Sequence, residues 1–113
     1  MPYTTAGKNA MLDALGVTHV SAHDGAPGDS GANEISGGSY ARQSITFASA
    51  SSGAIDSSNT PVIPIPAGAT VDQLGFWDSL SGGNCLATAD VTNEVFGSAG
   101  NYTVTDADLD LNG

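Results

Sequence analysis

Positive charge is nearly absent from this sequence. Lys8 and Arg42 are its only basic residues, whereas twelve residues are acidic, and the formal net charge is −10. A nucleic-acid-binding protein needs clustered lysines and arginines to neutralise phosphates, and an anionic membrane surface attracts the same residues. No apolar run approaches the ~18 residues that a membrane-spanning helix needs. We therefore predict that the protein binds neither nucleic acid nor a membrane.

Cysteine and charged residues in general are also scarce. Cys85 is the single cysteine, so no disulfide can form within the chain, and we expect it to be a small buried side chain. Charged residues make up 12% of the chain, against about 25% in an average soluble domain. Few side chains are therefore available for acid–base catalysis, and we predict that the protein is not an enzyme.

Small and apolar residues fill the space instead. The 113 residues include 15 glycines, and 40% of the chain is hydrophobic. This content is too apolar for a disordered acidic tail, and the length suits one modest core. We predict one folded domain over residues 1–113.

The N-terminal segment is the only predicted helix. We expect it over about residues 5–15, capped by Thr4 or Thr5 and closed by Gly16. Its buried stripe would consist of four residues: Ala10, Met11, Ala14 and Leu15. Its polar residues would face water: Lys8, Asn9 and Asp13.

Residues 17–111 combine short alternating patterns with glycine-rich turns, which is typical of β structure. We expect six or seven strands, among them 17–23, 40–48, 61–66, 71–78, 85–91 and 102–111. Residues 24–33 would form a surface loop and residues 49–59 a connector. The prolines within 61–66 would place that strand on a sheet edge. We therefore predict a mainly β, single-domain antiparallel β-sandwich or jelly roll with one short N-terminal α-helix.

The end of the chain alternates acidic and apolar residues. Ala107, Leu109 and Leu111 would face a core, and the opposite face would carry four polar residues: Asp106, Asp108, Asp110 and Asn112. We interpret this face as solvated or covered by a partner. The alternative is a weak calcium site, because the spacing resembles the opening of an EF-hand loop without its closing glutamate. No other cofactor or metal is predicted.

Two histidine patterns could indicate chemistry. His19 and His23 are four apart, but on a strand their Cα atoms would stand about 13 Å apart, too far to share one zinc ion. We expect both histidines on a polar strand face. Ser21, His23 and Asp24 offer the residue types of a catalytic triad, but adjacency in sequence is not triad geometry and no nucleophile elbow is present.

Four residues are candidates for core or interface positions: Arg42, Phe76, Trp77 and Tyr102. A lone arginine in a chain of this charge will pair with a carboxylate. We favour a partner within the chain over one in a neighbouring subunit. The aromatic side chains would supply buried area worth several kcal/mol in a core or an interface.

Five motifs in fixed order are more specific than these patterns. They are T-x-x-x-N-x-M-L-D, H-V-S-x-H-x-G-x-P-G, G-G-S-Y-A-R-Q, G-F-W-D and Y-T-V-T-D-A-D-L-D-L-N. Together they resemble a family of small virion proteins of tailed bacteriophages, in particular phages of actinobacteria, that are described as tail-fibre-like or minor tail proteins. The resemblance covers nearly the whole chain.

The resemblance implies a non-enzymatic structural protein of the virion, made in the host cytoplasm and bound to major capsid or tail proteins. We expect a homo-oligomer. A capsid-surface decoration protein is favoured over a tail-fibre or minor tail protein, because one compact domain without a shaft is predicted. The alternative from another class is a carbohydrate-binding module, in which Trp77, Asp78 and the acidic face 106–112 would contact a surface sugar.

Overall fold

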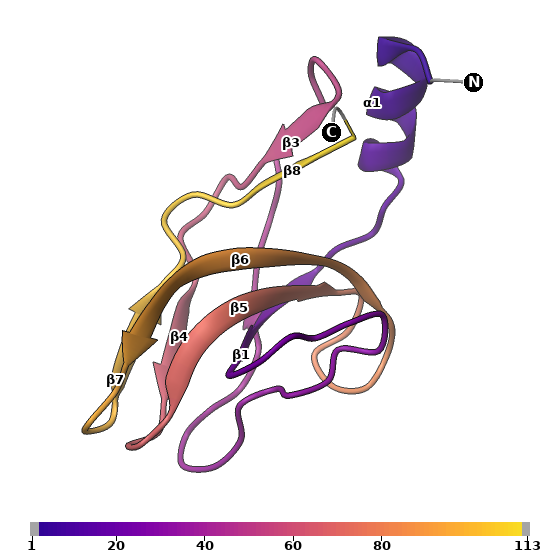
Figure 1. Ribbon diagram of the computed structural model, residues 1–113. Helices are drawn as coiled ribbons and strands as arrows, with labels where there is room; N and C mark the ends of the chain where they lie inside the picture. The colour runs from indigo at the N-terminus through magenta and orange to yellow at the C-terminus, as the bar shows by residue number, and fades with distance from the viewer. Residues whose placement is uncertain (1–2, 112–113) are drawn as a thin grey trace.

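The computed structural model describes residues 3–111 and is mainly β, which confirms the predicted class. One helix, α1 (Thr5–Asp13), precedes the strands of this described part (Figure 1). The strands are β1 (His19–His23), β2 (Gln43–Ser44), β3 (Ala54–Asp56), β4 (Val62–Ile65), β5 (Thr70–Trp77), β6 (Cys85–Val95), β7 (Gly100–Thr103) and β8 (Asp108–Asp110). The molecule is elongated, with extents of 46 × 25 × 24 Å.

The strands form three antiparallel sheets. The largest has the order β2-β1-β5-β6, and the other two are the pairs β4–β7 and β3–β8. The proline-containing strand β4 has β7 as its one partner among the described strands, as an edge position requires. The large sheet and the two small pairs enclose a common core.

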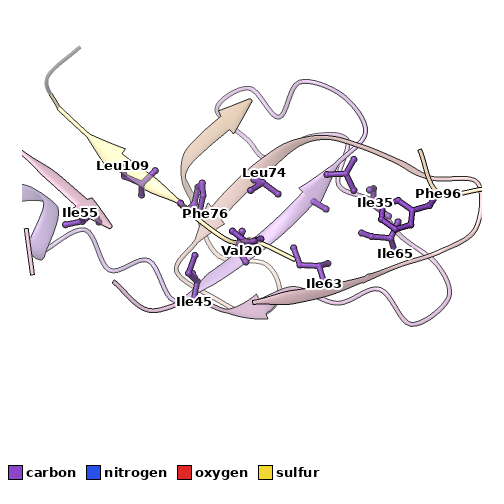
Figure 2. Close-up of a cluster of buried hydrophobic side chains, with 14 of the residues drawn as sticks. Val20, Ile35, Ile45, Ile55, Ile63, Ile65, Leu74, Phe76, Phe96 and Leu109 are labelled. Atoms are coloured by element: carbon purple, nitrogen blue, oxygen red, sulfur yellow. The ribbon is translucent and has the colours of Figure 1, made fainter. Parts of the chain in front are cut away.

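The core lies on one face of β1 and β5. Val20 is opposite Phe76 in the register, and Ala22 is opposite Leu74, so these four side chains share a face. All four are buried, and Figure 2 shows three of them gathered with side chains from the other segments. Burial of the valine, leucine and phenylalanine side chains contributes about 1.5–3 kcal/mol each, which makes this face the main source of stability.

Helix α1 differs from its prediction in length and in the face that it buries. Thr4 caps it, with its side chain accepting from Gly7 N at 3.2 Å, but the helix ends at Asp13 rather than at about residue 15. Leu12 is its buried residue, whereas Met11 is 36% exposed. Of the predicted stripe, Leu15 is half-buried and packs against the core, whereas the prediction is wrong for Ala10, Met11 and Ala14, which are exposed.

Polar side chains dock α1 on the rest of the fold. Asn9 Oδ1 accepts a hydrogen bond from Gly53 N at 2.8 Å, and Asp13 Oδ1 accepts one from Ala50 N at 2.7 Å. These residues are four apart and therefore lie on one side of the helix. Since α1 packs beside β3 through this side, Asn9 is half-buried rather than solvated.

The predicted strand 102–111 is divided in two. Its first part, β7, pairs with β4, and its last part, β8, pairs with β3. Val104 and Ala107 are both buried although they are three residues apart. A continuous strand would bury Asp106 together with Val104, because alternate residues share a face. The break shifts the alternation so that Ala107 enters the core.

Other strand boundaries also differ from those predicted. The predicted strand 40–48 is reduced to β2, because Tyr40 and Arg42 belong to the polar network described below. The predicted connector 49–59 contains β3, whose Ile55 is buried. Strand β6 continues to Val95, beyond the predicted end at residue 91.

Candidate functional site: a buried polar network and an open furrow

The second face of β1 and β5 is polar and also buried. Ser21 is opposite Gly75 and His19 is opposite Trp77 in the register, so Ser21, His23 and Trp77 point away from the apolar core. Ser21 and His23 are 0% exposed and Trp77 is 5% exposed. Residues 24–42, which we name the covering loop, close over this face. The surface loop predicted for 24–33 is thus part of a lid on buried polar groups.

The hydrogen bonds on this face form a chain with one consistent set of protons. His23 Nδ1 lies 2.8 Å from the carbonyl of Ala32, which can only accept, so Nδ1 carries a hydrogen. Burial lowers the pKa of His23, which keeps the ring neutral and leaves Nε2 as an acceptor. Ser21 Oγ therefore donates to Nε2 at 2.6 Å and accepts from Trp77 Nε1 at 2.7 Å.

Two glycines provide the room for this chain. A Cβ at Gly75 would stand 2.6 Å from Ser21 Oγ and 2.7 Å from His23 Nε2. A Cβ at Gly31, in the covering loop, would stand 2.3 Å from the Trp77 ring, and Gly31 has a φ of +75° that side chains disfavour. The polar face therefore depends on glycine at both positions.

Arg42 holds the covering loop against the sheet. Its guanidinium stacks on Trp77 at 3.5 Å from the ring centroid, an arrangement that favours a cation over an indole. Nε and Nη2 donate to the two carboxylate oxygens of Glu34 at 3.0 and 2.9 Å. Nη1 donates to the carbonyls of Ser79 and Gly82 in the turn before β6. Arg42 thus pairs within its own chain.

Tyr40 connects Glu34 to the sheet. Its hydroxyl donates to Glu34 Oε2 at 2.7 Å and accepts from Ala22 N at 3.0 Å. Burial raises the pKa of Tyr40 far above its ordinary value, so the hydroxyl keeps its proton. Burial would raise the pKa of Glu34 too, but hydrogen bonds from Arg42 and Tyr40 outweigh it and lower this pKa. The carboxylate is therefore charged when paired.

This network contains a serine and a histidine, the residue types of a nucleophile and a base, but a substrate cannot reach them and no carboxylate among the described residues orients the histidine. Ser21 and His23 are sealed from solvent, and the second nitrogen of His23 is bonded to a backbone carbonyl rather than to Asp24. His23 lies on the polar face of its strand, as predicted, but the covering loop buries this face. Burial also raises the pKa of the Cys85 thiol, which disfavours a reactive thiolate.

The acidic end of the chain lies at the β3–β8 pair. Asp108 is directly opposite Asp56 in the register, and hydrogen bonds with Asp56 and Asp106 raise the pKa of Asp108 to about 6. Among residues 3–111, no three histidine, cysteine or acidic side chains are grouped so that they could hold a metal ion. Asn112, the fourth residue of the calcium candidate that includes Asp110, lies outside the described residues.

A furrow follows β6, between this strand and the stretch of chain from residue 102 to residue 111. Its first hollow, about 430 Å³, lies between α1, residues 86–88 of β6 and residues 108–111. Its second hollow, about 500 Å³, lies between residues 90–94 of β6 and residues 102–106, with Leu74 also lining it. Since the two hollows follow one another along the same two segments, we name them together the β6 furrow.

The four core or interface candidates occupy different places. Phe76 is in the apolar core at 1% exposure, and Trp77 and Arg42 belong to the buried network. Tyr102 is half-buried, packs against the core and lines the β6 furrow. Sequence reasoning missed the partners of the network: Gly31, Glu34, Tyr40 and Gly75. The polar residues that alternate with Val20 and Ala22 gave no signal of this burial, because the same pattern is typical of a solvent-exposed strand face.

Comparison with known proteins identifies the family. A family model described as "Gp80: Podophage GP4 fiber I protein gp80" matches residues 4–111. No curated protein matches the chain significantly. Within residues 3–111, no helix is long and apolar enough to cross a membrane. Because the match spans nearly all of the sequence, the chain belongs to the podophage fibre protein family gp80.

Proposed function

We propose that the protein is a non-enzymatic component of a virion fibre that binds other virion proteins. The match of residues 4–111 to a fibre protein family carries this proposal. The capsid decoration role that we predicted has no specific support in that match, so a fibre position takes precedence. The actinobacterial host implied by the sequence resemblance stays a prediction.

The arrangement of reactive groups supports a structural role. Ser21 and His23 are hydrogen-bonded to each other, but both are sealed beneath the covering loop. A substrate would have to displace that loop, together with the contacts of Arg42, to reach them. These groups therefore serve the fold.

The burial of Trp77 weakens the carbohydrate alternative. A sugar platform needs an exposed aromatic face, whereas one face of this indole is covered by Arg42 and its N–H is bonded to Ser21. The tryptophan fluorescence of the folded protein should therefore not respond to added sugars.

Localisation in purified phage particles tests the proposal. Quantitative mass spectrometry against the major capsid protein gives the copy number, and immunogold electron microscopy gives the position. A few copies located at the tail fibres support the fibre role. Copies that match the capsid subunits in number and cover the shell would instead establish decoration, and absence from particles would overturn a virion role.

Homo-oligomerisation is part of the same proposal. Three large hydrophobic side chains are exposed and are candidates for burial against symmetry mates: Tyr3, Val62 and Val95. Sedimentation velocity of the purified chain measures its state directly, and a monomer at all concentrations would contradict this part of the proposal.

A further inference from the structure

The sandwich is open along β6. Within residues 3–111, β6 pairs with β5 on one side and with no strand on the other. Figure 1 shows the stretch that leads from β7 to β8 passing along β6, but the β6 furrow separates the two segments. A strand edge presents unpaired N–H and C=O groups and is therefore a template for a further strand.

The second hollow of the furrow is acidic. Three carboxylates line it, those of Asp90, Glu94 and Asp106, and none of the described lining residues is basic. Asp90 and Glu94 are exposed. Because the carboxylates surround an open strand edge, they favour an occupant that carries positive charge.

The first hollow of the furrow is more apolar than the second. Leu12, Leu86 and Leu109 line it, together with the carboxylates of Asp108 and Asp110. Apolar side chains of an occupant would gain burial there. Because the two hollows follow one another along β6, an extended segment matches both when the half beside residues 86–88 is apolar and the half beside residues 90–94 is basic.

A second copy of this chain does not suit the furrow. The chain has only two basic residues and a net charge of −10, and Arg42 is already bonded to Glu34. A second copy would mainly add like charge at the acidic hollow, which is unfavourable. The occupant must therefore come from a different protein.

We propose that the β6 furrow binds an extended, lysine- or arginine-rich segment of another virion protein, which adds as a strand to the open edge of β6. This inference rests on the proposed function, because it names the kind of partner that a fibre component would contact. The carboxylates select a basic segment, and the apolar hollow anchors it.

Titration of the isotope-labelled full chain with a designed peptide tests the inference. The probe carries valines over one half and lysines over the other half of about nine residues, a usual strand length, and it is made in both orders. Peptides of equal length with glutamate in place of lysine are the comparison. The lysine peptide should shift the amide signals of residues 86–94 and slow their hydrogen exchange, and binding should weaken with salt. Absence of binding, or equal binding of the glutamate peptide, would overturn the inference.

Paired charge variants locate the effect. Asp90→Asn with Glu94→Gln should raise the Kd of the lysine peptide about tenfold, because two rim charges are lost. Asp24→Asn with Asp29→Asn removes the same charge from exposed positions of the covering loop and should leave the Kd unchanged. Equal losses in both pairs would indicate general charge attraction and contradict a furrow site.

A photo-crosslinking residue at Thr92 extends the test to the particle. Thr92 is exposed and lines the furrow, and Ser30 in the covering loop is the exposed control. A crosslink to another virion protein at Thr92 alone supports the inference, whereas a crosslink to a second copy overturns it. If the chain is absent from particles, the proposed function fails, and the peptide titration still decides whether the furrow binds a basic strand.

Discussion

The two faces of β1 and β5 are both buried, but by different interactions. The apolar face carries Val20, Leu74 and Phe76, which pack without requiring particular partners. The opposite face carries Ser21 and Trp77 together with His23, where each donor has an identified acceptor. Apolar packing tolerates changes that keep volume, whereas a buried polar network is favourable only when it is complete.

This difference assigns a separate task to each face. The apolar face supplies most of the burial that stabilises the fold. The polar face adds little net energy per hydrogen bond, but it admits one arrangement of the covering loop, because Arg42, Glu34 and Tyr40 must all meet their partners. We infer that one face stabilises the sandwich and the other fixes the shape of its surface loop.

Phe76→Ala should give the largest loss of stability, because it removes a fully buried ring from the apolar face. We expect the free energy of unfolding to fall by about 3–5 kcal/mol, measured by urea denaturation. Leu80→Ala, at a position that is 57% exposed, should change it by less than about 0.5 kcal/mol. A loss below about 1 kcal/mol for Phe76→Ala would show that the apolar face is not the main core.

Gly31→Ala should be the most damaging change on the polar face. The added Cβ meets the Trp77 ring and also has to adopt a positive φ. Gly28 has a φ of +58° but no atom within 4 Å of the added Cβ, so Gly28→Ala isolates the backbone cost. We expect a loss of about 1 kcal/mol for Gly28→Ala and about 1–3 kcal/mol more for Gly31→Ala. Equal losses in urea denaturation would mean that the contact with Trp77 is not tight.

Ser21→Ala should cost about 2 kcal/mol, because it leaves Trp77 Nε1 and His23 Nε2 buried without partners. The matched control is Ser44→Ala, at an exposed position of β2, which should change the free energy of unfolding by less than about 0.5 kcal/mol. Tryptophan fluorescence should shift only in Ser21→Ala. A neutral Ser21→Ala variant would show that water or a rearrangement satisfies both groups.

Acidification should weaken the polar face through His23. Burial lowers the pKa of His23 from its ordinary 6.5. Below pH 6.5, His23 is therefore protonated in the unfolded chain while it is still neutral in the folded chain. The stability contributed by neutral His23 is therefore present above pH 6.5 and is lost as the pH falls toward the lowered pKa. Titration of both imidazoles by nuclear magnetic resonance checks this. If His23 titrates with a pKa at or above the ordinary 6.5, the assigned hydrogen-bond chain is wrong.

The apolar face was predictable from the sequence and the polar face was not. Alternation placed Val20, Leu74 and Phe76 on strands, because a period of two has one interpretation there. The same alternation assigned His23 to a polar face, but it did not show that this face is buried. The covering loop buries His23 through residues that follow it later in the sequence, including Glu34 and Arg42. No local sequence pattern indicates that this loop covers the strand.

The C-terminal error has a related cause. Residues 102–111 were predicted as one strand, but the buried positions change from even to odd numbers between Val104 and Ala107. This change was visible in the sequence and indicates a break. It could not reveal that β7 and β8 join different partners, because pairing over such sequence distances depends on the packing of the whole chain.

The smallest expected effect on stability comes from Asp108, at the pair β3–β8. Its dependence on pH is opposite in sign to that of His23. The folded-state pKa of Asp108 is raised to about 6 from 3.8, so the folded chain holds a proton that the unfolded chain releases. The associated stability is present below pH 3.8 and is lost as the pH rises through about 6. Asp108→Asn should therefore stabilise β8 modestly above that pH and hardly at all in acid.

Hydrogen exchange at the amide of Leu109, compared at about pH 5 and about pH 8 after correction for the intrinsic rate, measures this effect. Asp29→Asn, in the covering loop, makes the same change in net charge and should leave that amide unaffected. If both variants slow exchange equally, reduced overall repulsion rather than the facing pair Asp56 and Asp108 would be responsible. If only Asp108→Asn slows exchange, the repulsion between like charges directly opposite each other across the strands weakens this end of the sandwich. A basic partner segment beside Asp108 in the β6 furrow would relieve the same repulsion.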